Sequence, residues 1–208
     1  MSRIFDMTVT ERCHLLLADH LGPGDTAIDC TCGNGNDTLF LCRSVGPKGR
    51  VYAFDIQEQA LKNTEDLLKR EGFEAELFLC SHCCLEERIN ERSDRAPSVI
   101  MYNLGYLPGA DHGFTTRTEE TIASLRQALA LVKRDGLVSV IAYPGHEEGK
   151  REAAAVRDLL EGLPKKSFEV LTITQTNRSD TTPVLHLIHK RSMNPYDDAV
   201  ENSIRHTR

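Results

Sequence analysis

The chain has 208 residues, of which 40% are hydrophobic and 27% charged, and its formal net charge is −6. These values are typical of one globular domain, and the acidic balance argues against a protein that coats nucleic acid indiscriminately. No apolar run approaches the roughly 18 residues that span a bilayer, and the N-terminus lacks the apolar core of a signal peptide. The seven cysteines show no spacing typical of a disulfide framework, so we expect reduced thiols and a cytoplasmic location.

Strand-like and helix-like patterns alternate along the whole chain. The predicted strands are residues 26–30, 51–55, 75–80, 98–103, 137–143, 168–176 and 184–190. The predicted helices are residues 10–21, 37–44, 58–71 (ending at Gly72), 118–133 and 147–163. This alternation implies a parallel sheet with helices on both faces, whereas the short turn between the last two strands predicts an antiparallel hairpin at the sheet edge. We therefore expect an α/β fold with a seven-stranded, mostly parallel sheet, in one domain of residues 1–191 followed by a tail of residues 192–208.

The sequence DCTCGNGND, residues 29–37, follows the first predicted strand. Ligands of parallel sheets bind outside the carboxyl ends of the strands, which is where this loop lies. Its two glycines let the backbone approach a ligand closely, and we expect Asp37 and Thr38 to cap the next helix. Asp55 ends the second strand, where a carboxylate accepts hydrogen bonds from the hydroxyls of an adenosine ribose. The loop and this acid predict a cofactor that contains a nucleoside.

The charge of the loop distinguishes between two cofactors. A pyrophosphate loop has the pattern G-x-G-x-x-G without nearby negative charge, but Thr38 replaces the third glycine and Asp29 and Asp37 flank the loop. Two carboxylates would repel the pyrophosphate of NAD and suit a cation. S-adenosylmethionine carries an ammonium, a sulfonium and an adenosine, so it is the predicted cofactor. The predicted contacts in the loop are Asp29, Gly33, Asn34, Gly35, Asn36 and Asp37.

The cysteines raise the alternative of a metal site. Cys30 and Cys32 lie in the loop, and Cys80, Cys83 and Cys84 follow the third predicted strand. Structural zinc prefers paired C-x2-C knuckles, each on its own turn, and buried cysteine is an ordinary small apolar residue. We therefore expect no metal.

Three polar residues follow the second and third strands. In this kind of sheet Ser81 and His82 approach the adenine of a bound nucleoside, or they are a capping serine and a solvated histidine. Gln57 either borders the adenosine or simply starts a helix. The residues leave both alternatives open.

The fourth strand ends in the sequence N-L-G-Y, residues 103–106. This layout is that of the N-P-P-Y motif of amino-group methyltransferases, in which the asparagine accepts hydrogen bonds from the target amine and the aromatic residue stacks on the base. Such catalysis is mostly positioning. Asn103 and Tyr106 are thus catalytic candidates, although both prolines are replaced and the alternative is a turn with a core tyrosine.

The fifth strand is followed by Y-P-G-H, residues 143–146. Tyr143 is expected to face the same pocket as a substrate contact. His146 could accept the proton of the methylated amine, which makes it a third catalytic candidate, or bind substrate. A helix-capping role is the alternative.

Together these segments resemble a known family over residues 7–190. The matching motifs are D-x-T-C-G-N-G-x-D-T at 29–38, F-D-I-Q-E-Q-A at 54–60, S-H at 81–82, N-L-G-Y-L-P-G at 103–109, Y-P-G-H-x-x-G at 143–149 and N-x-x-x-x-x-P at 177–183. The chain resembles the bacterial tRNA 5-(aminomethyl)-2-thiouridine methyltransferases, formerly described as rRNA methylases. The resemblance implies a Rossmann-like class I methyltransferase fold and methyl transfer from S-adenosylmethionine to the exocyclic amine of the wobble uridine.

The resemblance also implies a partner, the anticodon region of tRNA, for a monomer or homodimer with no membrane association. Because the net charge is negative, tRNA requires a local basic cluster. The candidates are Lys150, Arg151, Arg178, Lys190 and Arg191, with Arg178 as a substrate contact. The alternatives are methylation of rRNA or of a small-molecule amine, a non-catalytic binding module, and an NAD oxidoreductase.

Overall fold

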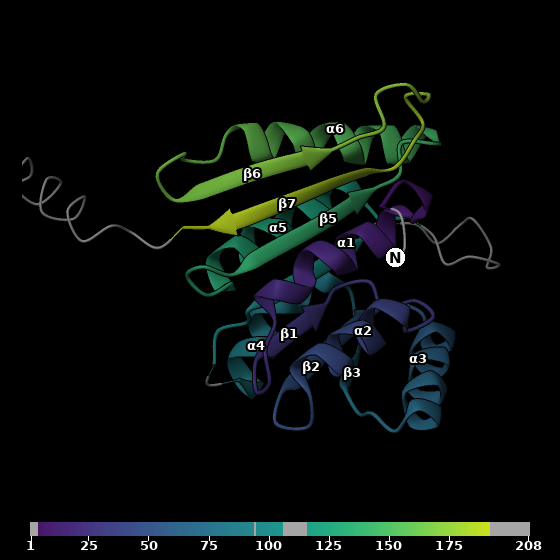
Figure 1. Ribbon diagram of the computed structural model, residues 1–208, viewed down its shortest axis with the longest axis vertical. Coiled ribbons are helices and arrows are strands. Elements are labelled where there is room, and N and C mark those ends of the chain that lie inside the picture. The colour runs from purple at the N-terminus through teal and green to yellow at the C-terminus, as the bar shows by residue number, and fades with distance from the viewer. Residues whose placement is uncertain (1–3, 94, 106–115, 192–208) are drawn as a thin grey trace, which may run out of the picture.

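The computed structural model describes residues 4–93, 95–105 and 116–191. Within these residues seven strands form one sheet in the order β3-β2-β1-β4-β5-β7-β6 (Figure 1). The strands are β1 Thr26–Asp29, β2 Arg50–Asp55, β3 Glu76–Leu79, β4 Val99–Asn103, β5 Leu137–Ala142, β6 Phe168–Ile173 and β7 Val184–Lys190. Strands β1 to β5 are parallel, whereas β7 is antiparallel to both β5 and β6. This architecture confirms the predicted α/β fold and its C-terminal hairpin, in which β6 occupies the edge.

Helices cover both faces of the sheet (Figure 1). The helices are α1 Val9–Leu17, α2 Asn36–Val45, α3 Glu58–Glu71, α4 Leu85–Arg92, α5 Thr118–Leu131 and α6 Glu147–Glu161, with 3-10 turns η1 Ile4–Asp6, η2 Ala18–His20 and η3 His82–Cys84. One core cluster joins α1, α2 and α3 to the sheet, and a second joins α4, α5 and α6 to its other face. None of the described helices is long and apolar enough to cross a membrane.

The predicted and observed helices agree at the end of α3 and differ at the first helix and at α4. Helix α3 ends at Glu71 and is followed by Gly72, whose φ of +76° is the left-handed cap expected there. The first helix stops at Leu17, where the backbone tightens into a 3-10 turn, rather than continuing to residue 21. Helix α4 was not predicted, because only Leu85 and Ile89 of its eight residues are buried and two apolar positions give little periodicity.

Strand direction brings separate parts of the chain to one edge of the sheet. Asp29, Asp55 and Asn103 are the last residues of three parallel strands. In the antiparallel pair of β5 and β7, Ala142 lies opposite Val184. The loop between β6 and β7 therefore lies at the same carboxyl edge as the loops after β1, β2, β4 and β5.

Candidate functional site

The loop after β1 is fixed by the two strands that flank β1. The N–H of Cys30 donates to the carbonyl of Met101 in β4 at 2.9 Å. The N–H of Cys32 donates to the carbonyl of Phe54 in β2, also at 2.9 Å. The strand order changes direction at β1 and β4, and such a switch point is where open α/β sheets bind their ligands.

Gly35 ends the loop and packs it against α3. Its φ is +82°, a conformation that favours glycine, and a Cβ at this position would lie 2.8 Å from the Cα of Thr64. Helix α2 begins directly after it at Asn36, and its N-cap makes no side-chain hydrogen bond. The prediction that Asp37 and Thr38 cap this helix is therefore wrong. Both side chains lie in its first turn, are buried, and bind other parts of the site.

Asp29 supports the loop from beneath. Its side chain is 0% exposed, and its two oxygens accept hydrogen bonds from the Thr38 hydroxyl at 2.6 Å and from the Thr31 N–H at 3.1 Å. Burial, reinforced by the neighbouring Asp37 carboxylate, raises the pKa of Asp29 to about 7. Asp29 was predicted to contact a cofactor, but in this geometry it shapes the loop and does not face solvent.

Asp55 joins the loop to the end of β2. Its carboxylate accepts hydrogen bonds from the N–H of Gly33 at 3.0 Å and from the N–H of Gln57 at 2.9 Å. Burial raises the pKa of Asp55, and these backbone hydrogen bonds oppose the rise. Gln57 directly precedes α3, so it starts the helix and borders Asp55 at the same time. The side chain of Asn34 is held by Asn63 of α3, whose Nδ2 donates to it at 2.9 Å.

Three elements meet at the side chain of Asp37. Its Oδ2 accepts a hydrogen bond from Nδ2 of Asn103, at the end of β4, at 3.0 Å. Its Oδ1 lies 2.6 Å from Nε2 of His14 in α1. The His14 ring stacks on Phe40 with centroids 4.0 Å apart and planes inclined by 5°. The N–H of Asn103 donates to the Thr31 hydroxyl at 2.8 Å, which ties β4 to the loop.

Ser81 and His82 follow β3 on the same edge. The Ser81 hydroxyl donates to Glu120 at 2.6 Å and accepts from the Cys83 N–H at 3.3 Å, so Ser81 is a capping residue. His82 is not solvated, because it is only 7% exposed and its ring meets Tyr102 edge-on. Burial lowers the pKa of His82 to about 4, so the ring is neutral at pH 7. Its buried Nδ1 has no hydrogen-bond partner among the described residues, and a ligand group could supply one.

Tyr143 and His146 follow β5. Burial raises the pKa of Tyr143, and the nearby Thr10 side chain opposes this rise. His146 caps α6, because its Nδ1 accepts the N–H of Gly149 at 3.1 Å. A neutral imidazole that accepts at Nδ1 carries its proton on Nε2, so this geometry supports the capping role and not that of a proton acceptor. Gly149 permits the arrangement, since a Cβ there would lie 2.2 Å from the Tyr143 carbonyl.

The predicted basic cluster divides between the two edges of the sheet. Arg178 lies in the loop between β6 and β7, at the carboxyl edge, and α6 carries Lys150 and Arg151 near its beginning. Lys190 and Arg191 were wrongly grouped with them. Because β7 is antiparallel, its end lies at the opposite edge, where Lys190 donates to backbone carbonyls of α5 and the α5–β5 turn and Arg191 pairs with a carboxylate of β6.

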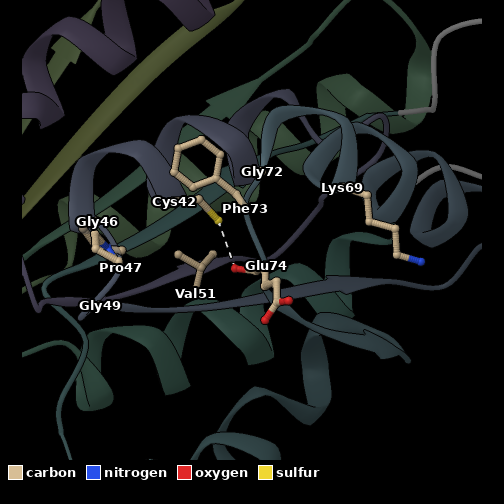
Figure 2. A pocket seen from close by; sticks show the side chains of 10 residues that line it. Cys42, Gly46, Pro47, Gly49, Val51, Lys69, Gly72, Phe73 and Glu74 are labelled. Carbon is tan, nitrogen blue, oxygen red and sulfur yellow. Dashed lines mark hydrogen bonds between the residues drawn. The ribbon is translucent and has the colours of Figure 1, made fainter.

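Two of the cavities lie at opposite edges of the sheet. The larger, about 570 Å³, is lined by the turns that follow α2 and α3, at the amino edge, and contains the contact of Cys42 Sγ with the Glu74 carbonyl at 3.5 Å (Figure 2). The smaller, about 490 Å³, is lined by the start of α1, by Tyr143 and by the β6–β7 loop. The smaller cavity therefore lies at the carboxyl edge of the sheet, although neither the loop after β1 nor Asn103 is part of its lining, whereas the larger cavity lies at the amino edge. No group of three or more potential metal ligands occurs in the described part of the chain, and Tyr106 lies outside the described residues.

The sequence interpretation missed the contribution of α1. Thr10 and His14 reach Tyr143 and Asp37 from this helix. Thr10 and His14 are four residues apart and share one face of α1 with the buried Leu17. They are therefore polar residues on the apolar face by which α1 packs on the sheet. That interruption of the apolar stripe was the available signal.

Comparisons with known proteins relate this chain to methyltransferases. Residues 51–189 match the family described as "Putative rRNA methylase". The chloroplastic tRNA (mnm(5)s(2)U34)-methyltransferase of Arabidopsis thaliana is 35% identical over 192 residues, which cover 88% of this chain and 69% of that protein. The crystal structure titled "putative rRNA-methylase" from Clostridium thermocellum has a TM-score of 0.83 at 35% identity, covering 88% of this chain and 98% of that chain. A methyltransferase from Streptococcus mutans in complex with SAH has a TM-score of 0.77 at 31% identity, with the same coverage.

The buried Asp29 carboxyl leads to a prediction about stability. The folded pKa is raised from 3.8 to about 7, so the folded chain holds this proton over a range in which the unfolded chain has lost it. The free energy of unfolding of the ligand-free protein should therefore fall as pH rises from about 4 to about 7, by at most about 4 kcal/mol from this group. Urea denaturation of the wild type and of Asp29→Asn across this range tests this. Parallel pH profiles for the two proteins would show that Asp29 does not titrate there.

Proposed function

The chain belongs to the "Putative rRNA methylase" family, and we propose that it methylates the 5-aminomethyl group of the wobble uridine, or 2-thiouridine, of tRNA. It is an S-adenosylmethionine-dependent methyltransferase of the RNA-modifying type. The finer assignment rests on the site at the end of β4, where Asn103 presents an amide beside the cofactor loop. The similarity to a tRNA methyltransferase acting at U34 supports it.

The residues around the loop suit the cofactor. Gly33 and Gly35 give the backbone close access, and Asp55 at the end of β2 is the proposed acceptor for the ribose hydroxyls. His82, with Ser81 and Gln57 beside it, is proposed to meet the adenine, because its unpartnered Nδ1 is buried at the same edge. Asn34 and Asn36 complete the proposed loop contacts, Asp29 shapes the loop from beneath, and the Asp37 carboxylate adds negative potential that favours a cation.

The chemistry required of the protein is mainly positioning. S-adenosylmethionine, when bound, would supply a methyl group whose carbon–sulfur bond breaks as the amine nitrogen forms the new bond, and the methylated ammonium would then release its proton to water. The Nδ2 of Asn103 is bonded to Asp37, so Oδ1 is the atom that this amide offers to an N–H of the amine. Holding that N–H directs the nitrogen lone pair, which is the orientation the displacement requires. A partly dehydrated pocket also favours the neutral amine.

The substrate is proposed to enter from the side of the smaller cavity. Its walls come from α1, Tyr143 and the β6–β7 loop, so it lies at the same carboxyl edge of the sheet as Asn103, and its volume of about 490 Å³ lies in the range of ligand pockets. Arg178 in that loop, with Lys150 and Arg151 of α6, supplies positive charge at the same edge. We therefore propose that the tRNA backbone lies across the β6–β7 loop, with Tyr143 beside the target nucleoside. Tyr106 is proposed to stack on the base.

Asn103→Ala separates catalysis from cofactor binding. We expect the single-turnover rate of methyl transfer to tRNA carrying 5-aminomethyl-2-thiouridine to fall by about 100-fold, because the lone pair is no longer directed, while the affinity for S-adenosylmethionine stays within about twofold. Rapid-quench transfer assays and calorimetry provide the two numbers. A wild-type rate in Asn103→Ala would mean that the amine is held elsewhere.

Charge reversal at the carboxyl edge tests the RNA surface. Arg178→Glu should raise the KM for tRNA and reduce its salt dependence, because a phosphate contact is lost. Arg134→Glu is the matched control, since Arg134 is also exposed but lies in the turn before β5, at the opposite edge. The two variants have the same net charge, so equal effects on KM would refute a local contact by Arg178.

A further inference from the structure

The amide of Asn103 has two orientations of nearly equal shape. Rotating it by 180° exchanges Oδ1, which accepts hydrogen bonds, with Nδ2, which donates them. In one orientation Oδ1 faces the substrate amine and accepts one of its N–H groups. In the other orientation Nδ2 faces the amine, so that an N–H of the amide meets the N–H groups and lone pair of the substrate. The proposed chemistry needs the first orientation, so a contact that distinguishes the two ends of the amide matters for the rate.

Asp37 is the group that distinguishes them. A carboxylate only accepts hydrogen bonds, so the end of the amide that faces Oδ2 at 3.0 Å must be Nδ2. The side chain of Asp37 is 5% exposed and belongs to the first turn of α2. Its backbone position is therefore fixed by a helix, and little water is available to replace a lost partner.

Asp37 itself is held by His14. The two side chains are 2.6 Å apart from Nε2 to Oδ1, so the second oxygen of the carboxylate is also occupied. The His14 ring cannot easily turn away, because it is stacked on Phe40, and α1 is anchored in the core by Cys13 and Leu17. Without a donor at position 14, Oδ1 would be buried without this partner and the carboxylate would be free to rotate. A rotated carboxylate no longer presents Oδ2 to Nδ2 of Asn103, so the contact that distinguishes the two ends of the amide is lost.

From these contacts we infer that His14 is a positioning residue for methyl transfer. It fixes the Asp37 carboxylate, and Asp37 in turn orients the Asn103 amide with Oδ1 toward the acceptor amine. This inference rests on the proposed function of Asn103. Helix α1 thereby takes part in catalysis through His14, although His14 touches neither substrate nor cofactor in this scheme. His14 also lies outside residues 51–189, which match the family.

Two substitutions separate the hydrogen bond of His14 from its packing. His14→Phe keeps a ring that can stack on Phe40 but has no donor, whereas His14→Gln keeps an N–H donor of similar reach without the ring. We expect the single-turnover rate at saturating cofactor and tRNA to fall roughly 10- to 100-fold in His14→Phe and to stay within about threefold of wild type in His14→Gln. The affinity for S-adenosylmethionine should change by less than about twofold in both. His20→Ala is the control, because His20 lies just beyond the same helix, is exposed, and should transfer at the wild-type rate.

A second measurement is independent of the acceptor. The side-chain amide signals of Asn103, identified by their loss in Asn103→Ala, should shift in the nitrogen–proton NMR spectrum of His14→Phe and remain near their wild-type positions in His14→Gln. Unchanged signals in His14→Phe, or equal transfer rates in His14→Phe and the wild type, would overturn the role of His14. An equally slow His14→Gln would also overturn it. If the wild type fails to methylate the aminomethyl tRNA, the proposed function fails, and the NMR comparison alone then decides about His14.

Discussion

The buried carboxylate of Asp37 is the contact on which the site depends. Removing a carboxylate from water is costly unless its oxygens are hydrogen-bonded, and here they bind His14 of α1 and Asn103 of β4. One side chain thereby fixes the positions of two helices relative to a strand end. The position of Asp37 depends in turn on Gly35, because α2 can start where it does only if the loop packs closely on Thr64. Loss of the Asp37 carboxylate or of Gly35 would therefore disturb both the cofactor loop and the proposed contact of Asn103 with the acceptor amine.

The loop concentrates negative charge in a small region. The carboxylates of Asp37 and Asp55 both raise the pKa of Asp29, and of these three residues only Asp29 is completely shielded from solvent. A protein gains no stability from such a cluster in the absence of a counter-charge, so the arrangement fits a site whose ligand is a cation. A loop with these carboxylates would repel a pyrophosphate, which agrees with its departure from the G-x-G-x-x-G pattern at Thr38. The coarse function, methyl transfer from S-adenosylmethionine, follows from this loop and from the family, whereas the choice of acceptor depends on the ends of β4, β5 and β6.

Local sequence patterns predicted the fold more completely than the site. All seven strands were predicted from β-branched and aromatic runs, and the strand ends at Asp29, Asp55 and Asn103 follow from the parallel topology. The capping role of Asp37 and Thr38 was wrong because a helix boundary one residue earlier turns both side chains inward. Lys190 and Arg191 were grouped with the wrong edge because the basic residues were grouped by charge alone, without the direction that the predicted antiparallel hairpin gives to β7. His14 was missed because its partner is 23 residues away in the sequence: the interrupted apolar stripe of α1 marks the residue but does not identify that partner.

The most direct test of the proposed activity is the nucleoside composition of tRNA from cells that lack this chain. Mass spectrometry should show that 5-methylaminomethyl-2-thiouridine is lost and that the 5-aminomethyl form accumulates. Expression of the wild-type chain should restore the methylated nucleoside, and expression of Asn103→Ala should restore little of it. A normal level of the methylated nucleoside in the deletion strain, together with a lost methyl group in ribosomal RNA, would contradict the account.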